Sequence, residues 1–310
     1  MIYIFGAINI DIIAQKDKFL SKTSNIAKID LNFGGVGFNI FKSLKTSQKK
    51  FITSIGNDFI TPYLKKFLST LNCSYFVNNN LTNGKYVAFM ESGKLIYGAA
   101  DVRVVEEGFS KKFISNQLKR VKSNDLVIVD ANLYPSTVDF IVRNCLKKRL
   151  RVIFETVSVE KTSRSKNVLK NLFLITPTVE EMDALLPQKR VAGSLKENEK
   201  TRRNFSQEII NFMLKHKIEN IILTKGEKGV EWFCKIDPQD SKDSKNSKNS
   251  NVKIKYFKPS KIIKTKDTTG AGDLLLASIV NGIASTSFNN LERSTIKAMK
   301  IVEKFLQRKK

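Results

Sequence analysis

The sequence has few cysteines and no long hydrophobic run, and these absences remove several classes of protein. Its three cysteines, Cys73, Cys145 and Cys234, lie far apart and form no CxxC pair, which argues against a disulfide framework and a structural zinc site. No run approaches the roughly 20 apolar residues of a membrane span. We therefore expect a globular protein of a reducing compartment, the cytoplasm, without membrane association.

Two common nucleotide-binding motifs are missing as well. The chain contains neither the phosphate loop GxxxxGK[ST] nor the dinucleotide fingerprint GxGxxG. A secretory signal is not expected either, because the apolar first fifteen residues lack a basic leading segment and include Asp11. They predict a buried strand.

Acidic residues are scarce relative to basic ones, since 54 Lys and Arg face 29 Asp and Glu, a net charge of +25. Such a surplus raises the question of nucleic-acid binding, but the basic residues are scattered and no RNA-binding or zinc-finger motif accompanies them. We interpret the charge as a solvated, Lys-rich surface. A non-catalytic relative that binds nucleic acid is the alternative.

Length and pattern favour an α/β fold, because 310 residues with 41% hydrophobic content can bury a large core. Short apolar runs alternate with helix-like segments, which predicts βα units around a mainly parallel sheet. The predicted strands are Ile2 to Ile8, Leu126 to Asp130, Val152 to Thr156, Leu172 to Thr176 and Asn220 to Thr224. The predicted helices include Thr137 to Lys148 and Phe205 to Lys217.

Two further segments predict a small second sheet, a lid. Residues 27–33 alternate apolar and polar side chains, the period of a half-exposed strand, and residues 85–95 have the pattern of a hairpin. We expect lid strands at approximately 11–33 and 84–100 within one domain of residues 1–310. The polar tract Asp237 to Asn251 lacks apolar residues and predicts a disordered insertion before a strand at Val252 to Phe257.

The strongest local signal is the string Asp267-Thr-Thr-Gly270-Ala271-Gly272-Asp273, followed by a mainly apolar helix. Small residues at a helix start leave backbone N–H groups accessible, and the helix dipole adds positive charge, so this segment can bind an anion. Asp273 could accept the proton of an attacking hydroxyl. A plain turn with a helix-capping Asp is the simpler interpretation of a shorter GxGD string.

The whole string resembles the signature of the ribokinase-like (PfkB) carbohydrate kinases, and the resemblance extends over nearly the whole chain. It implies a three-layer α/β/α fold with a small β lid, phosphoryl transfer from ATP with Mg²⁺, and Asp273 as catalytic base beside the Gly270, Ala271 and Gly272 N–H groups. In relatives a monovalent cation such as K⁺ lies near the anion-binding loop. An exposed lid could also pair with a second copy to form a homodimer.

Two N-terminal segments resemble the substrate-binding parts of that family. The opening strand Gly6-Ala-Ile-Asn9-Ile-Asp11 places an Asn and an Asp toward a sugar-like substrate, and Gly34-Gly35-Val-Gly-Phe-Asn39 matches the family's Gly-Gly-x-x-x-Asn loop. A buried carboxylate can accept hydrogen bonds from two ribose hydroxyls. Glycines let backbone approach the sugar closely.

The nucleotide side is expected at Leu223-Thr224-Lys-Gly226, whose alternative interpretation is a simple turn, together with Thr268. The family's Asn-x-x-Glu appears here as Thr178-Val-Glu-Glu181, so the acid linked to Mg²⁺ through water is kept while the Asn is lost. Thr178 and Glu181 equally predict a helix capping box, and both roles can coexist.

Within the family, several segments resemble pseudouridine kinases, among them Ser92 to Arg103, Asp130 to Leu133 and Phe154 to Lys161. The resemblance implies that Asp101 and Asn132 contact the base or the sugar, although a surface ion pair and a structural loop residue are their alternatives. The implied reaction phosphorylates the 5′-hydroxyl of pseudouridine. A kinase acting on ribose, adenosine or another acceptor remains the nearest alternative, and the sequence does not decide between ATP and GTP.

Overall fold

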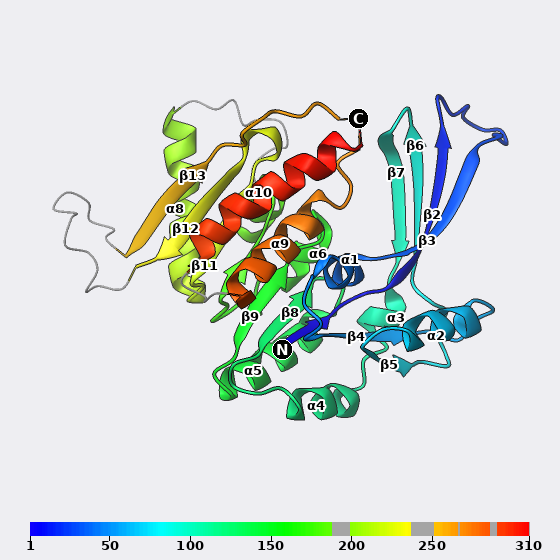
Figure 1. Cartoon of the computed structure of the whole chain (residues 1–310), viewed down its shortest axis with the longest axis horizontal. Coiled ribbons are helices and arrows are strands. Elements are labelled where there is room, and N and C mark those ends of the chain that lie inside the picture. Colours follow the sequence, from blue (N-terminus) through cyan, green and yellow to red (C-terminus); the bar gives the residue numbers. More distant parts are fainter. Residues whose placement is uncertain (188–198, 237–250, 266, 286–289, 310) are drawn as a thin grey trace.

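The computed structural model describes residues 1–187, 199–236, 251–265, 267–285 and 290–309 (Figure 1). Helices cover both faces of a large sheet, and a smaller sheet stands beside it. The predicted three-layer α/β fold with a mainly parallel sheet and a small β lid is therefore confirmed. Within the described ranges, no helix combines the length and the apolar character needed to cross a membrane.

The large sheet has nine strands in the order β13-β12-β11-β10-β9-β8-β1-β4-β5. Parallel pairs join the strands from β5 to β11, and β12 and β13 add an antiparallel edge. The strands are β1 (Ile2–Phe5), β4 (Lys49–Ile55), β5 (Cys73–Val77), β8 (Leu126–Asp130), β9 (Arg151–Glu155), β10 (Leu174–Ile175), β11 (Asn220–Thr224), β12 (Val230–Lys235) and β13 (Val252–Phe257).

Both faces of the central strands are buried, which explains their continuous apolar runs. Side chains alternate along β1, so Tyr3 and Phe5 join the core on one face while Ile2 and Ile4 join the core on the other. The first face packs against α4, α5, α7 and α8, and the second against α1, α2, α9 and α10. Polar residues that end these parallel strands therefore meet at one edge of the sheet.

The helices alternate with the strands along the chain, as a parallel sheet requires. Their bounds are α1 (Val36–Ser43), α2 (Thr61–Ser69), α3 (Arg103–Glu106), α4 (Lys111–Lys119), α5 (Pro135–Lys147), α6 (Val159–Ser165), α7 (Val179–Leu185), α8 (Glu199–His216), α9 (Ala271–Ser285) and α10 (Leu291–Gln307), with a 3₁₀ turn at Gly226–Lys228. The last two helices pack side by side on one face of the sheet (Figure 1).

Most predicted elements occur within two residues of their expected bounds, but one helix and two strands differ. The helix predicted from Phe205 begins at Glu199 in α8. The predicted strand over residues 2–8 divides, because β1 ends at Phe5 and the chain re-enters the small sheet at Asn9. The predicted strand over 172–176 is reduced to the two residues of β10. Pro177 follows and has no N–H to donate to a ladder, and the Thr176 hydroxyl is used by a neighbouring carboxyl instead.

The small sheet, called the lid below, has the strand order β3-β2-β6-β7. Its strands are β2 (Asn9–Lys16), β3 (Lys28–Gly34), β6 (Lys85–Glu91) and β7 (Lys94–Asp101). The two hairpins project together from the large sheet (Figure 1). The segment predicted as a disordered insertion lies outside the described residues except for Asn251, and β13 begins at Val252 as expected.

Candidate active site

The start of α9 carries the predicted anion-binding segment. Gly270 takes a positive φ of 81°, and Leu274 N–H donates to the Gly270 carbonyl at 3.0 Å to begin the helix. A Cβ built on Gly272 would meet nothing within 4 Å, so the backbone there faces open space. Because the first N–H groups of a helix lack acceptors within it, those of Gly272 and Asp273 suit an anion, whereas the Ala271 N–H already donates to the Thr268 carbonyl at 3.1 Å.

Asp273 and Asn39 come together across the junction of α9 and α1. The Asn39 side-chain N–H donates to Asp273 Oδ2 at 2.9 Å. Burial is the main cause that raises the pKa of Asp273 to about 6; the charges of Asp130 and Asp11 also act to raise it, while the Asn39 hydrogen bond and the charge of Lys42 act to lower it. A carboxylate whose pKa lies near 6 is ionised at neutral pH and still basic enough to take a proton.

Asp11 lies on β2 with an incomplete set of hydrogen bonds. Its Oδ1 atom is buried without a partner among the described residues, as is Oδ1 of Asn9. Burial raises the pKa of Asp11 to about 6, and the Lys42 charge opposes that rise. Buried polar atoms without partners are costly, so these two oxygens indicate a place for the hydroxyl or N–H groups of a ligand.

The glycine pair before α1 makes room for Asp11. Asn9 pairs with Gly34 in the β2–β3 ladder, and a Cβ on Gly34 would stand 1.8 Å from Asp11 Oδ2. Gly35 has a φ of 99°, a conformation that side-chain-bearing residues rarely adopt. The turn also places Asn39 beside Asp273, so one continuous structure contains Asn9, Asp11, Gly34, Gly35 and Asn39.

Asp130, at the end of β8, connects the segments of this structure through hydrogen bonds. Its carboxylate accepts the N–H groups of Ala7, Gly37 and Asn132 at 2.9–3.0 Å. These donors come from the end of β1, the start of α1 and the loop after β8. Asp130 therefore fixes the relative positions of the segments that carry Asp11 and Asn39, although no motif assigned it a role.

Asn132 is more deeply buried than we expect of a residue that contacts a substrate. Its side chain is 1% exposed, and its Oδ1 atom accepts a hydrogen bond of 2.5 Å from the Lys161 ammonium. Burial lowers the pKa of Lys161, and the charges of Asp130 and Glu106 oppose the change. The structure thus gives Asn132 a partner within the protein, and its contact with a substrate remains a prediction.

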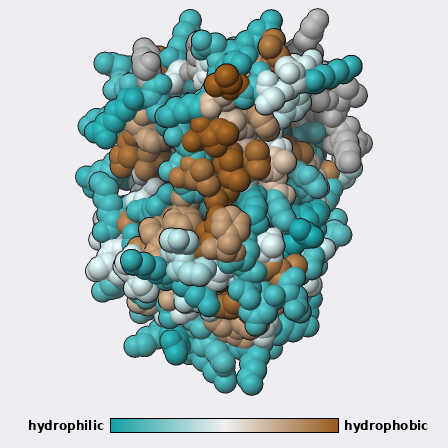
Figure 2. All heavy atoms as spheres, turned by 90° about the vertical axis from the view of Figure 1, so that its right-hand side faces the viewer, coloured by the Kyte–Doolittle hydropathy of each residue, from teal (hydrophilic) through white to brown (hydrophobic). Residues whose placement is uncertain are grey.

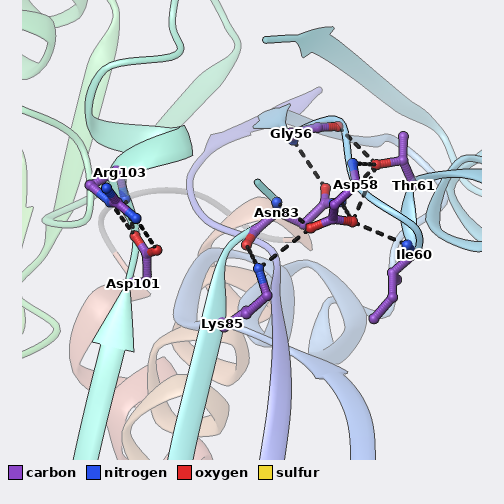
Figure 3. Close-up of polar contacts among 8 residues, drawn as sticks. All are labelled: Gly56, Asp58, Ile60, Thr61, Asn83, Lys85, Asp101 and Arg103. Carbon is purple, nitrogen blue, oxygen red and sulfur yellow. Dashed lines mark hydrogen bonds and ion pairs between the residues drawn. The ribbon is translucent and has the colours of Figure 1, made fainter. Parts of the chain in front are cut away.

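Asp101 is not brought together with Asp11. In the lid, Asp11 lies opposite Tyr86, and Tyr86 opposite Ala100, so these three residues share one face. Asp101 is one residue further along β7 and lies on the other face, where Arg103 binds it through two hydrogen bonds of 2.9 and 2.7 Å (Figure 3). Its role toward a base is likewise still a prediction.

The base of β6 is joined to the large sheet by a network around Asn83 (Figure 3). The Asn83 amide donates to Asp58 at 2.6 Å and to Thr61 at 2.8 Å, and its oxygen accepts the Gly56 N–H at 3.0 Å. Asp58 also accepts the Asn83 backbone N–H at 2.9 Å. Because Asn83 is 1% exposed and fully bonded, the network fixes the point where the lid leaves the large sheet.

Two of the residues expected on the nucleotide side, Thr224 and Gly226, lie at or just after the end of β11. Thr224 pairs with Thr178 in a parallel bridge, and its hydroxyl donates to the Pro177 carbonyl at 3.3 Å. Gly226 has a φ of 57°, and a Cβ there would meet nothing within 4 Å, so this turn is open to a ligand. Thr268 is exposed, and its carbonyl accepts the Ala271 N–H.

Glu181 forms the capping box that its spacing predicted. Thr178 and Glu181 cap the start of α7 reciprocally, and Glu181 Oε2 also accepts the Thr156 hydroxyl at 2.7 Å. Nearby, burial raises the pKa of Glu155 to about 8, the Thr176 hydrogen bond lowers it, and the charges of Asp273 and Glu181 raise it further. Three carboxyl groups therefore influence one another at this edge of the sheet.

These carboxyl groups suit a cation that arrives with a nucleotide. Among the described residues, no group of three or more His, Cys, Asp or Glu side chains could hold a metal ion alone. Mg²⁺ usually keeps several waters and uses one or two carboxylates together with substrate phosphates. The donor set of Glu181 and Glu155 fits such an ion, and the open helix start at α9 fits the phosphates.

Three residues of the site carried no sequence prediction: Asp130, Glu155 and Asn83. Asp130 and Glu155 end neighbouring parallel strands, which is a usable signal because ligands bind at the carboxyl ends of such strands. Asn83 gave no comparable signal, since its partners lie 22 to 27 residues away, between the end of β4 and the first residue of α2.

Comparisons with known proteins agree with this architecture. The profile of the pfkB family carbohydrate kinases matches residues 1–301. The pseudouridine kinase of Arabidopsis thaliana is 24% identical over 181 residues, which are 56% of this chain and only 46% of that protein, so the match spans about half of the relative.

Solved structures share the fold at low identity. Ribokinase from Giardia lamblia superposes with a TM-score of 0.72 at 14% identity, covering 98% of this chain and 90% of the other. Ribokinase from Thermotoga maritima gives 0.65 at 21% identity, covering 97% and 91%. With the family match spanning nearly the whole sequence, the chain belongs to the pfkB family of carbohydrate kinases.

Proposed function

We propose that this kinase transfers the γ-phosphoryl group of ATP to the 5′-hydroxyl of a nucleoside, pseudouridine in particular. The observation that carries the proposal is the position of Asp273. Its carboxylate lies at the open start of α9, is held by Asn39, and is coupled electrostatically to Asp11, whose Oδ1 atom lacks a partner among the described residues. A base, an anion site and an unsatisfied acceptor for a sugar are thus adjacent.

In the proposed reaction, Asp273 accepts the proton of the 5′-hydroxyl as its oxygen bonds to the γ-phosphorus. The bond between that phosphorus and the β–γ bridging oxygen breaks, and ADP leaves. The N–H groups at the start of α9 stabilise the charge on the transferring phosphoryl oxygens. Asn9 and Asp11 accept hydrogen bonds from ribose hydroxyls, which satisfies their buried oxygens.

Thr224, Gly226 and Thr268 border the nucleotide in this proposal, and Glu181 holds Mg²⁺ through water. When bound, Mg²⁺ would offset the negative charge of the phosphate oxygens. The charge of Glu181 helps to raise the pKa of Glu155, and a cation bound nearby would favour the ionised form of Glu155. The family resemblance also implies a monovalent cation such as K⁺ near the anion-binding loop, but in this chain two oxygens of that loop already bind the Lys309 ammonium.

Pseudouridine is the proposed acceptor because segments around Asp101, Asn132 and Lys161 resemble pseudouridine kinases, and because a pseudouridine kinase is among the relatives. Ribose, adenosine or another sugar or nucleoside would use the same Asp273 and Asp11. The choice among acceptors depends on side chains over the base, which the lid would supply.

The test measures ADP release and the mass of the product with Mg-ATP and a panel of pseudouridine, uridine, ribose and adenosine. Asp273→Asn is compared with Asp139→Asn, a surface change in an ion pair with Arg143. Turnover strongest on pseudouridine and lost only in Asp273→Asn is expected. Turnover on another acceptor would keep the mechanism and discard pseudouridine. A folded protein without turnover that binds RNA in a salt-sensitive way would support the non-catalytic alternative.

The lid face that bears Asp101 is the proposed contact between two copies. It exposes Ile29, Leu31, Phe89 and Tyr97 by 40–73%, and apolar side chains gather at the centre of this side of the molecule (Figure 2). Pairing with a second copy would cover them. Sedimentation should give a dimer that Leu31→Asp dissociates, while Ile262→Asp, at an exposed apolar residue outside the lid, leaves it intact. A monomeric wild type would rule this interface out.

A further inference from the structure

Lys309, which follows α10, binds the segment that precedes the catalytic helix. Its ammonium lies 2.7 Å from Asp267 Oδ2 and 2.9 Å from the Thr269 carbonyl oxygen. The other carboxylate oxygen of Asp267 accepts the Thr269 N–H at 2.8 Å. Residues 267–270, called the anion loop below, therefore bind the Lys309 ammonium through two of their oxygen atoms.

The same end of α10 makes two further contacts with the loop region. The Thr265 hydroxyl donates to the Lys309 carbonyl at 3.1 Å. The Lys309 ammonium lies 4.9 Å from the centre of the Phe305 ring, and that ring is 4.0 Å from the place where a Cβ on Gly270 would stand. Lys309 and Asp267 are consequently only 26% and 35% exposed, so water screens their attraction less than that of a surface pair.

The hydrogen bond to Thr269 determines where the next N–H group points. In a planar trans peptide the C=O and the N–H point in opposite directions. Because Lys309 draws the Thr269 carbonyl to its own side, the Gly270 N–H is directed to the other side of the loop. Lys309 thus orients the Gly270 N–H, a donor of the anion site, from the opposite side of the loop and does not occupy the site itself.

The groups around the ammonium are of a kind that also binds small monovalent cations. They are a carboxylate oxygen and a backbone carbonyl oxygen, both contributed by the loop itself. An ammonium group donates up to three hydrogen bonds to such oxygens and carries the same single charge as a free cation.

We propose that Lys309 is a positioning residue whose side chain acts as a tethered monovalent cation, holding the anion loop in its phosphate-binding conformation. This inference rests on the proposed function, because the loop is taken to bind a phosphoryl group. It makes phosphoryl transfer by the wild type independent of added monovalent cations.

The experiment compares wild type, Lys309→Met, Lys309→Arg and Lys304→Met at equal ionic strength in tetramethylammonium, potassium or ammonium chloride. Lys304 is an exposed lysine of the same helix and is the matched control. Wild type and Lys304→Met should be equally active in all three salts. Lys309→Met should lose about 10-fold or more in kcat/KM in tetramethylammonium, the loss expected for charged hydrogen bonds, and regain part of it in ammonium or potassium.

Three outcomes would overturn the inference: an unchanged Lys309→Met, a loss that no small cation restores and that accompanies a lower melting temperature, or a wild type that requires potassium. Lys309→Arg should retain more activity than Lys309→Met. Calorimetry also measures the ATP affinity of the same variants in the same salts. If no acceptor is phosphorylated by the wild type, the proposed function fails, while a cation-restored ATP affinity of Lys309→Met still decides the role of Lys309.

Discussion

Asn39 and Asp273 are 234 residues apart, yet the Asn39 amide donates to the Asp273 carboxylate at 2.9 Å. This contact joins the glycine turn before α1 to the start of α9. It also influences the chemistry of Asp273, since a donor to the ionised form lowers the pKa that burial raises. The pair can therefore be examined through the pH dependence of the reaction.

Replacing Asn39 with Leu, of similar size, should raise the pKa of Asp273 above its value of about 6, because the stabilising hydrogen bond is lost. In the wild type, kcat/KM should fall as the pH drops through about 6 and Asp273 becomes protonated. In Asn39→Leu this acid limb should move to higher pH. Lys42→Met should move it in the same direction, since the Lys42 charge also lowers the pKa. A limb that stays in place in both variants would contradict the assignment of Asp273 as the base.

Asp11→Asn should raise the stability of the protein and lower its activity. The pKa of Asp11 is raised by burial to about 6, so the folded protein holds its proton more tightly than the unfolded chain. The ionised form is therefore unfavourable in the fold at pH 7, and stability falls as the pH rises from about 4 to 6. Removing the charge should raise the melting temperature of the unliganded protein at pH 7.

The same substitution should lower kcat/KM by about 100-fold, because it removes the charged acceptor that we propose for sugar hydroxyls. It should also shift the remaining acid limb to lower pH, as the Asp11 charge raises the pKa of Asp273. Asp30→Asn, on the neighbouring strand of the lid, is the control. A variant that is both less stable and less active would indicate a structural role for Asp11.

The main features of the fold could be predicted because they depend on local patterns. Strands buried on both faces, such as Leu126–Asp130 and Asn220–Thr224, have continuous apolar runs, and their bounds agree with the structure. The lid strands were recognisable from the alternation of apolar and polar side chains along them. Their pairing was not, because the parallel contact of β2 with β6 depends on a register set by distant residues.

The motifs likewise predicted which residues belong near the anion loop, but not which of them touch. Asp101 shows the difference: its place after the hairpin put it on the lid, whereas the register of β6 and β7 decides that it lies on the face opposite Asp11. Lys309 could not have been predicted from a pattern. Its partners are 40 and 42 residues away, and one lysine among many gives no signal.

Glu155→Gln should change how stability depends on pH. Burial raises the pKa of Glu155 to about 8, far above that of an unfolded glutamate near 4.5. Between these values the folded state binds the extra proton, so the free energy of unfolding falls as the pH rises, with a slope of up to about 1.4 kcal/mol per pH unit. Gln can still accept the Thr176 hydroxyl hydrogen and removes the titration.

Urea unfolding of the unliganded protein at several pH values from 5.5 to 8.5 measures this effect. The wild type should lose stability relative to Glu155→Gln across the range, and Glu227→Gln, at an exposed position, should follow the wild type. Parallel curves for all three proteins would show that Glu155 is already ionised in the fold.

Asn83→Leu should loosen the base of the lid. The substitution removes the two amide donors to Asp58 and Thr61 and leaves the Gly56 N–H without its acceptor in a buried place. Leaving buried polar groups unpaired costs about 1–3 kcal/mol each, so the free energy of unfolding should fall by at least that amount.

A mobile lid should hold the acceptor less firmly, because Asp11 and Tyr86 belong to it, whereas the start of α9 does not. We therefore expect the KM for the nucleoside to rise several-fold more than the KM for ATP. Arg103→Met, which breaks only the exposed pair with Asp101 (Figure 3), is the matched control and should leave stability unchanged. Equal changes in both KM values would indicate that the Asn83 network supports the whole site and does not act through the lid.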